Sequence, residues 1–544
     1  MRINLSNNRL AILTLFLLIV ISSSCKKSPK PDITDNPTDR NGGSPATGTR
    51  TQLTLDSLFL YAKQIYYWSD AIPAYDVFNP RQYSSKSKPI DNYDDELFAI
   101  SNLKINPATG KPFEYNGYGY PKYSRIDDLT QANPSATSAI RTANVDVDNN
   151  GYDVGIRPIF YLFRNSDKYQ LFVTAVYPGS PAETAGVKRG WLITKVNGQT
   201  VGASYTNENE TVFNSFSAAS ITIEGYNAID KVPFSLTLNR ASYKSNPVYT
   251  SKVIARSGKK IGYLAYARFA RLSSSTGASD ASLDPVFADF SAQGVTDLIV
   301  DLRYNGGGYV NTASYLTNLI APSGTSGQTM FTELYNPLMQ AGNATILANQ
   351  PLLDGDGKII RQNGKILTAA DDNYSVAANT ITFSKKGSLG GINNIVFIVT
   401  RNTASASEIV INSLKPYMNV KLVGDTTYGK PVGFFPILLE NRYQVYMPIF
   451  ETRNSKNEGG YYTGMVPDVL DEYDDPEYVF GDVRENYLAK ALNVLAPSVT
   501  ATQGVANTET RRASTVDFKS QQIRKVNPNS EFVGMIETRH SLKK

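Results

Sequence analysis

A serine and a lysine lie 25 residues apart in segments that suit covalent chemistry. Ser405 belongs to Thr403-Ala-Ser-Ala-Ser-Glu408, and Lys430 ends Thr427-Tyr-Gly-Lys430. The sole histidine among 544 residues is His540, a poor candidate for the imidazole that a Ser-His-Asp hydrolase needs. A lysine can replace it when burial or a neighbouring cation lowers its pKa. If the chain is a hydrolase, we therefore expect Ser405 as nucleophile and Lys430 as base.

A glycine-rich loop supplies the complementary chemistry. Asp301-Leu-Arg-Tyr-Asn-Gly-Gly-Gly308 follows the apolar segment Leu298–Leu302. Loops at the carboxyl ends of the strands of an open α/β sheet meet at one edge, so this loop should lie near Ser405 and Lys430. We expect the N–H of Gly307 or Gly308, with that of Ala406 at a helix start, to form an oxyanion hole. Asp301 and Arg303 are expected to form only a strand-end ion pair.

The expected elements indicate an α/β core. Continuous apolar strands alternate with helices, which is typical of a sheet covered on both faces. The expected strands are Ile261–Ala265, Leu298–Leu302, Ile395–Val399, Val420–Val423 and Tyr443–Glu451, and the expected helices Leu283–Ala292, Val310–Ile320, Ser405–Lys415 and Asp482–Leu495. Leu53–Trp68 and Asp94–Asn102 predict a small helical N-terminal region.

A β-rich segment precedes this core. Its string from Val176-Tyr-Pro-Gly-Ser-Pro-Ala to Val-Asn-Gly198 resembles a PDZ domain, with Trp191 where an Asp is often found. A PDZ domain binds an extended peptide as an added strand and captures its carboxylate on loop N–H groups. That loop would be Tyr152–Ile156, and we expect Gly155 and Ile156 to bind the peptide.

The serine, lysine and glycine segments, in this order and spacing, resemble the C-terminal processing peptidases, also called tail-specific proteases. The likeness runs from about residue 150 to 495 and includes Gly464-Met-Val-Pro-Asp468. It implies an α/β core of the ClpP/crotonase type with an inserted or preceding PDZ domain and a Ser405–Lys430 dyad. The segment Tyr66–Pro73 is similar to lipoprotein members from Bacteroidetes-like bacteria.

Two positions depart from the family pattern. Phe434 stands where many members have a glutamine that orients the lysine, and Gly306 stands where proline is common. Glu408, Thr426 or Tyr428 could replace the glutamine, and the sequence does not choose among them.

Each motif also has a simpler interpretation. Ser405-Ala-Ser-Glu408 fits a helix capping box, and a lone lysine is usually a solvated surface residue. Asp146–Gly151 matches only the first half of a calcium loop, because Arg157 stands at its twelfth position. We predict no metal and no cofactor.

The N-terminus has the pattern of an export signal. Arg2 and Arg9 precede the apolar run Leu10–Ile21, and small residues precede Cys25, the single cysteine. This resembles a bacterial lipobox, with Ser22 at a position that is usually Leu or Val. We expect lipidation of Cys25 and an exported protein anchored in the cell envelope, at the periplasmic or surface face of the outer membrane; a plain signal peptide is the alternative.

The sequence thus divides into six predicted parts. These are a signal peptide (1–24), a tether (25–50), a helical N-terminal region (51–145), a PDZ domain (150–245), a catalytic domain (250–495) and a polar tail of low order (496–544). The formal charge of +5 is too small and dispersed to indicate nucleic-acid binding.

The leading hypothesis is a serine endopeptidase acting near the C-termini of polypeptides, which bind through the PDZ domain and an active-site groove. The alternative is a catalytically silent PDZ lipoprotein that only binds peptides. An enzyme that stays latent until its substrate arrives lies between the two.

Overall fold

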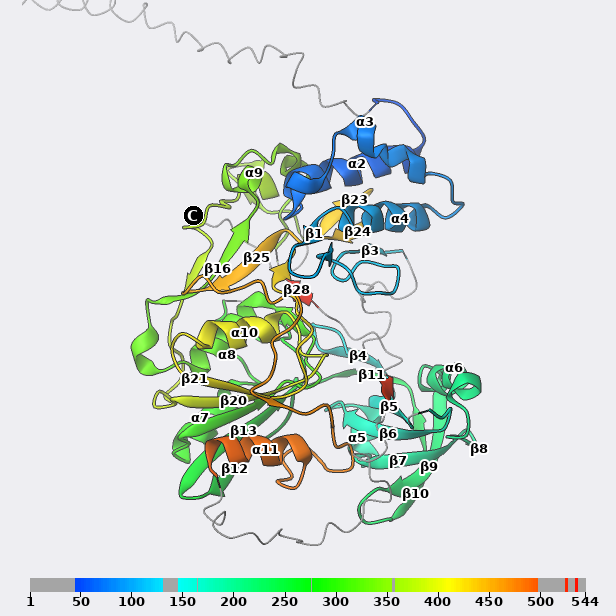
Figure 1. The fold of residues 1–544 in the computed structure, drawn as a ribbon, viewed down its shortest axis with the longest axis vertical. Helices are drawn as coiled ribbons and strands as arrows, with labels where there is room; N and C mark the ends of the chain where they lie inside the picture. The colour runs from blue at the N-terminus through cyan, green and yellow to red at the C-terminus, as the bar shows by residue number, and fades with distance from the viewer. Residues whose placement is uncertain are drawn as a thin grey trace, which may run out of the picture.

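The computed structural model describes residues 45–130, 145–163, 165–274, 276–354 and 358–497, together with 524–526 and 534–536. Three units are visible: N-terminal helices, the β-rich unit predicted to be a PDZ domain (the PDZ unit), and an α/β core between them (Figure 1). Within these described ranges, no helix is both long and apolar enough to cross a membrane.

A six-stranded sheet forms the centre of the α/β core. Its order is β12-β13-β14-β20-β21-β26, with β12 antiparallel to β13 and the other neighbours parallel. The bounds are β12 Val248–Arg256, β13 Lys259–Tyr266, β14 Asp297–Asp301, β20 Asn394–Val399, β21 Asn419–Gly424 and β26 Val469–Leu470.

Helices cover both faces of this sheet, as the apolar strands predict. Leu298 and Val300 of β14 pack into the core shared with helices α7, α8 and α10, whereas Ile299 faces the core beneath α11. This alternation follows from the two-residue period of a strand. The bounds are α7 Asp284–Ala292, α8 Val310–Ile320, α10 Ala406–Leu414 and α11 Asn486–Leu495.

Two smaller sheets lie between the core and the N-terminal helices. One has the order β19-β16-β25-β22 and the other β23-β24-β3. The predicted single strand Tyr443–Glu451 is wrong, because β24 and β25 are separated around Pro448, which has no N–H for a ladder. The bounds are β3 Arg125–Asp128, β16 Thr329–Tyr335, β19 Thr380–Thr382, β22 Val432–Gly433, β23 Ile437–Leu439, β24 Tyr443–Tyr446 and β25 Phe450–Asn454.

The N-terminal region is helical only in part. Its elements are α2 Arg50–Ile65, α3 Tyr75–Phe78, α4 Pro89–Ser101, β1 Ile105–Asn106 and β2 Lys111–Pro112. Strand β3 then leaves the helices and pairs with β24, with Arg125 opposite Tyr446. This pairing ties the N-terminal region to the α/β core.

The PDZ unit is a twisted sheet with two helices. Its sheet order is β10-β9-β7-β6-β5-β27, with β8 beside β7. The bounds are β5 Ile156–Leu162, β6 Tyr169–Val176, α5 Pro181–Thr184, β7 Trp191–Val196, β8 Gln199–Thr200, α6 Tyr205–Phe216, β9 Ser220–Asn227 and β10 Pro233–Asn239. The strands β4 Asn150–Asp153 and β11 Ala241–Lys244 pair with each other where the chain enters and leaves the unit.

A buried ion cluster joins the PDZ unit to the core. Arg303 pairs with Asp301 at 2.8 Å, as predicted, and also with Asp474 and Glu485 at 3.0 and 2.8 Å. Arg189 of the PDZ unit reaches the same Asp474 at 3.0 Å. Buried charges are stable only when paired, so this cluster fixes the two units against each other.

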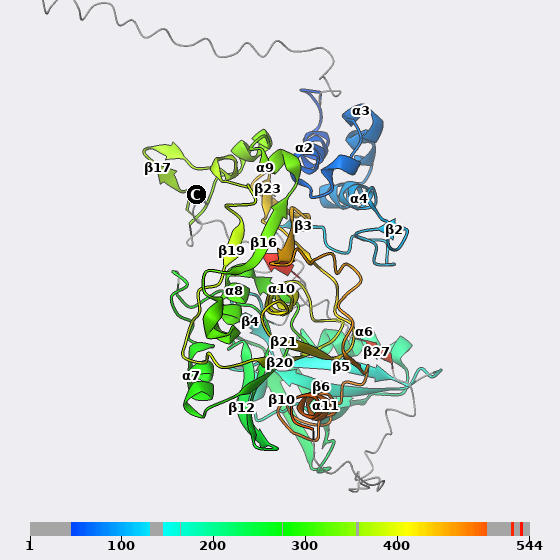
Figure 2. The ribbon, with the colours of Figure 1, turned by 60° about the vertical axis from the view of Figure 1, so that its left-hand side comes forward.

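The prediction of a tail of low order needs a correction at two segments. Strand β27, Arg524–Val526, pairs antiparallel with β5 of the PDZ unit, and β28, Gly534–Ile536, pairs parallel with β15, Gly307–Tyr309. In two views, β28 lies near α10 and β27 beside β5 (Figures 1 and 2). Cys25 and the predicted signal peptide lie outside the described residues.

Candidate active site

Ser405 stands on a strained turn between β20 and α10. Its backbone angles are φ 62° and ψ −113°, in the left-handed half of the map that a non-glycine residue rarely adopts. Such strain costs about 1–3 kcal/mol and is typical of functional positions, including nucleophiles on strand-to-helix turns. The Oγ of Ser405 is buried and forms no hydrogen bond with any described residue.

The glycine loop lies directly against this turn. The backbone oxygen of Asn305 accepts hydrogen bonds from Ala404 N–H and Ser407 Oγ at 3.1 and 3.0 Å. Gly308 has φ 137°, and a Cβ there would lie 2.1 Å from the backbone oxygen of Phe269. Only glycine therefore fits at this position, and the loop is fixed beside Ser405.

The predicted oxyanion hole needs one correction. The N–H of Gly307 donates to the side-chain oxygen of Asn305 at 3.0 Å and is already engaged. Gly308, one residue further along β15, remains the candidate donor, together with Ala406 at the first position of α10.

The buried carboxylate of Glu408 brings the serine and lysine segments together. Its Oε2 accepts hydrogen bonds from the backbone N–H groups of Ser405 and Lys430 at 2.7 and 2.8 Å. Its Oε1 accepts from Gly429 N–H at 2.8 Å and from Thr427 Oγ1 at 2.5 Å. One side chain thus fixes the backbone of both predicted catalytic residues, and the capping-box glutamate acts beyond its own helix.

Lys430 is buried beside aromatic rings. Its side chain is 1 % exposed, and its Nζ lies 4.3 Å from the centre of the Phe434 ring and 5.7 Å from that of Tyr123. The rings exclude water, which disfavours the ammonium form, although their faces attract a cation weakly. Phe434, at the position of the expected glutamine, therefore forms one wall of the lysine site.

Burial and nearby charges together favour the neutral amine. Burial is the largest cause of a pKa for Lys430 well below that of an ordinary lysine, and Arg125 lowers it further. Glu114 and Glu408 oppose the shift, whereas Lys122 adds to it. A neutral Lys430 can accept the Ser405 proton at a pH where a surface lysine could not.

The three residues considered as replacements for the glutamine have other contacts. Glu408 binds the backbone N–H of Lys430, and Tyr428 donates its hydroxyl to the backbone oxygen of Lys122 at 2.9 Å. The backbone N–H of Thr426 donates to Asp425 at 2.7 Å. Glu408 therefore orients the segment that holds Lys430 by binding the backbone of that segment.

Residues of the N-terminal region, which the sequence did not predict for this site, complete the surroundings of Lys430. Tyr123 donates its hydroxyl to the backbone oxygen of Gly429 at 2.5 Å, across 306 positions of sequence. The Nζ of Lys122 donates to that oxygen at 3.2 Å, and burial lowers the pKa of Lys122 to about 8. The spacing of residues within a motif cannot predict contacts between residues that are hundreds of positions apart.

Comparison with known proteins agrees with this geometry. Residues 260–470 match the family model described as peptidase family S41, and residues 172–212 match a PDZ domain model. Residues 260–470 thus form a domain similar to the S41 peptidases, called the S41 domain. The predicted family resemblance and fold class are thereby confirmed, with the PDZ domain preceding the S41 domain.

Two curated relatives illustrate the match. A chloroplastic C-terminal processing peptidase of Tetradesmus obliquus is 29 % identical over 261 residues, which cover 46 % of each protein. A carboxyl-terminal-processing protease of Synechocystis is 23 % identical over 308 residues, covering 57 % of this chain and 60 % of that protein. The match thus spans about half the length of these relatives.

A solved structure supports the fold. A Bacteroides fragilis protein assigned to the S41 proteases is 21 % identical, with a TM-score of 0.50. The alignment covers 80 % of this chain and 96 % of that one.

The predicted carboxylate loop of the PDZ unit also needs a correction. The N–H of Gly155 donates to the carboxylate of Asp153 at 2.5 Å, and Tyr243 donates its hydroxyl to the same oxygen at 2.8 Å. Burial raises the pKa of Asp153 to about 6. An acidic side chain thus occupies the Gly155 donor, which disfavours a terminal carboxylate at this position.

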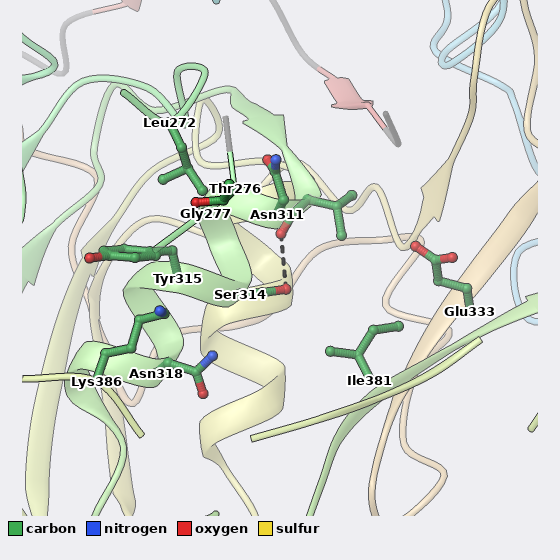
Figure 3. A pocket seen from close by; sticks show the side chains of 11 residues that line it. Leu272, Thr276, Gly277, Asn311, Ser314, Tyr315, Asn318, Glu333, Ile381 and Lys386 are labelled. Carbon is green, nitrogen blue, oxygen red and sulfur yellow. Dashed lines mark hydrogen bonds between the residues drawn. The ribbon is translucent and has the colours of Figure 1, made fainter. Parts of the chain in front are cut away.

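A separate hollow of about 350 Å³ lies beside α8 of the S41 domain (Figure 3). Tyr315, Lys386 and Glu333 are among its lining residues, and neither Ser405 nor Lys430 is. The Nζ of Lys386 lies 4.9 Å from the centre of the Tyr315 ring. This hollow is therefore separate from the site that holds Ser405 and Lys430.

The half calcium loop has a structural explanation. Asp146 Oδ1 accepts backbone N–H groups of Asp148 and Asn150 at 2.9 and 2.8 Å. Over the described residues, no cluster of three or more His, Cys, Asp or Glu could hold a metal ion.

Glu408→Gln tests the hydrogen bonds by which Glu408 joins the Ser405 and Lys430 segments of the S41 domain. A glutamine replaces one acceptor oxygen with an NH2 group facing N–H donors, so we expect a loss of about 1–3 kcal/mol of stability. Misplacement of the dyad should slow reaction of Ser405 on the order of 10²-fold. Thermal unfolding and the labelling rate with a fluorophosphonate measure both effects. Glu210→Gln, at an exposed carboxylate of α6, is the control and should change neither.

The charges around Lys430 should set how the reactivity of Ser405 depends on pH. The active amine is neutral, so reactivity should rise with pH through the Lys430 pKa. Removing the positive charge in Arg125→Gln raises that pKa and should move the rise to higher pH, whereas Glu114→Gln should move it to lower pH. The labelling rate of Ser405 across pH measures both. Arg125→Lys keeps the charge and should resemble the parent; shifts of equal sign in the two charge-removing variants would contradict the assignment.

Proposed function

We propose that this chain is a serine endopeptidase that cleaves polypeptides by acyl transfer to Ser405, with Lys430 as general base. The observation that carries the proposal is the Glu408 carboxylate, one oxygen of which binds the backbone N–H groups of both residues. The low pKa of buried Lys430 and the strained backbone of Ser405 support it.

The cycle follows from these positions. The neutral amine of Lys430 accepts the Ser405 proton as Oγ adds to a peptide carbonyl, and the resulting ammonium protonates the leaving amine. The N–H groups of Gly308 and Ala406 stabilise the oxyanion. A water molecule then hydrolyses the acyl-enzyme, with Lys430 again as base.

Substrates are proposed to be extended segments near protein C-termini that add as a strand to the β5 edge, in the place that β27 takes in the chain itself. The occupied Gly155 N–H argues for recognition of backbone along this edge instead of a free carboxylate. Nothing in this arrangement favours the peptide-binding scaffold without catalysis, because such a scaffold needs neither a strained serine nor a lysine of low pKa.

Covalent labelling tests the dyad. Incubation with a fluorophosphonate, followed by peptide mass spectrometry, should place the adduct on Ser405. Ser405→Ala should abolish it, and Lys430→Met should slow it by at least about 10²-fold, the usual contribution of a positioned base. Ser407→Ala, at the neighbouring hydroxyl, should still be labelled. An adduct that forms equally fast without the Lys430 amine would overturn the assignment.

We also propose that the protein is exported and anchored through a lipid on Cys25, supported by the apolar run Leu10–Ile21 and the small residues before the cysteine. Cells expressing the protein with a clickable fatty acid should incorporate the label, and Cys25→Ser should not. Ser24→Ala keeps a small residue there and should remain labelled. Absence of label from the parent chain would rule out lipidation.

A further inference from the structure

The S41 domain and the PDZ unit both bind the same distant part of the chain. Strand β27 continues the PDZ sheet at its β5 edge, with Lys525 opposite Tyr161. Strand β28 lies along β15, with Gly534 opposite Gly307 and Ile536 opposite Tyr309. An extended segment added to a sheet edge is how a peptide ligand binds a PDZ domain. The chain's own C-terminal segment thus occupies the positions of a substrate at both places.

The register places one carbonyl at the nucleophile. The N–H of Gly534 donates to the backbone oxygen of Gly306 at 3.1 Å. In a parallel ladder a residue bonds to the two residues flanking its partner, so the carbonyl of Gly534 is directed toward the N–H of Gly308. Gly308 is the oxyanion donor assigned above.

Ser405 lies next to the same carbonyl. A Cβ on Gly307 would be 2.4 Å from the carbonyl oxygen of Gly534 and 2.9 Å from the Cβ of Ser405, so both atoms border one small space. Beyond the carbonyl, Ile536 forms a bridge with Phe434, whose ring contacts Lys430, and its side chain is 8 % exposed. The segment is therefore held on both sides of the Gly534–Met535 bond.

We propose that the C-terminal segment is an intramolecular substrate, cleaved between Gly534 and Met535. The inference rests on the proposed function. Ser405 Oγ bonds to the Gly534 carbonyl carbon as the bond to the Met535 nitrogen breaks, and the serine proton passes through Lys430 to that nitrogen. Water then hydrolyses the ester and leaves a carboxylate on Gly534. The released peptide begins at Met535, and its departure frees the β15 edge for other polypeptides.

Intact-mass spectrometry of the purified full chain tests the cleavage. The parent chain should end at Gly534, and Ser405→Ala should retain Lys544. Gly534→Pro removes the N–H that binds Gly306 and should retain the tail, whereas Gly504→Pro, outside the two strands, should lose it. When the parent enzyme is added to the intact Ser405→Ala protein, it should cleave the tail of that variant more slowly than it cleaves its own tail. Cleavage at another bond, or equal rates between molecules, would overturn the proposal.

Two further readouts separate this inference from the proposed function. If Ser405 takes up the fluorophosphonate yet Lys544 is retained, the self-cleavage is wrong and the peptidase assignment stands. If neither adduct nor cleavage occurs, both fail. Hydrogen exchange in Ser405→Ala tests tail binding without catalysis: β15 and β5 should be more protected than in the same variant carrying Gly534→Pro, and equal exchange would contradict the proposed binding.

Discussion

The carboxylate of Glu408 is the constraint on which the active site depends. It lies in the first turn of α10 and accepts hydrogen bonds from the Ser405 turn and from the Lys430 segment. Burial raises its pKa, and these hydrogen bonds oppose the shift. Because every donor around it is an N–H or a hydroxyl, the ionised form is the one that the geometry satisfies. A capping residue has thus become the link between the proposed nucleophile and the proposed base.

The lysine site depends on parts of the chain that are far apart in sequence. Strand β3 pairs with β24 and thereby holds Arg125, Tyr123 and Glu114 close to Lys430. Aromatic rings exclude water and like charges repel, so the neutral amine is favoured without an imidazole. The N-terminal region therefore shapes the surroundings of Lys430.

The PDZ unit and the core act as one body through buried charge. Arg189 and Arg303 share Asp474, so moving one unit from the other would leave charges unpaired in a dry interface. Strand β27 of the C-terminal segment pairs with β5 of the PDZ unit, and β28 pairs with β15 of the core.

Elements that follow local rules could be predicted from the sequence. Continuous apolar strands specified the covered sheet, the glycines specified the loop beside Ser405, and the turn string specified the PDZ unit. Tertiary structure alone decided which groups surround Lys430, that Glu408 joins the two segments, that Asp153 occupies the Gly155 N–H, and that the tail pairs with both units. Periodicity and capping involve neighbours within a few residues, whereas these contacts join positions up to hundreds of residues apart, and only the folded chain brings them together.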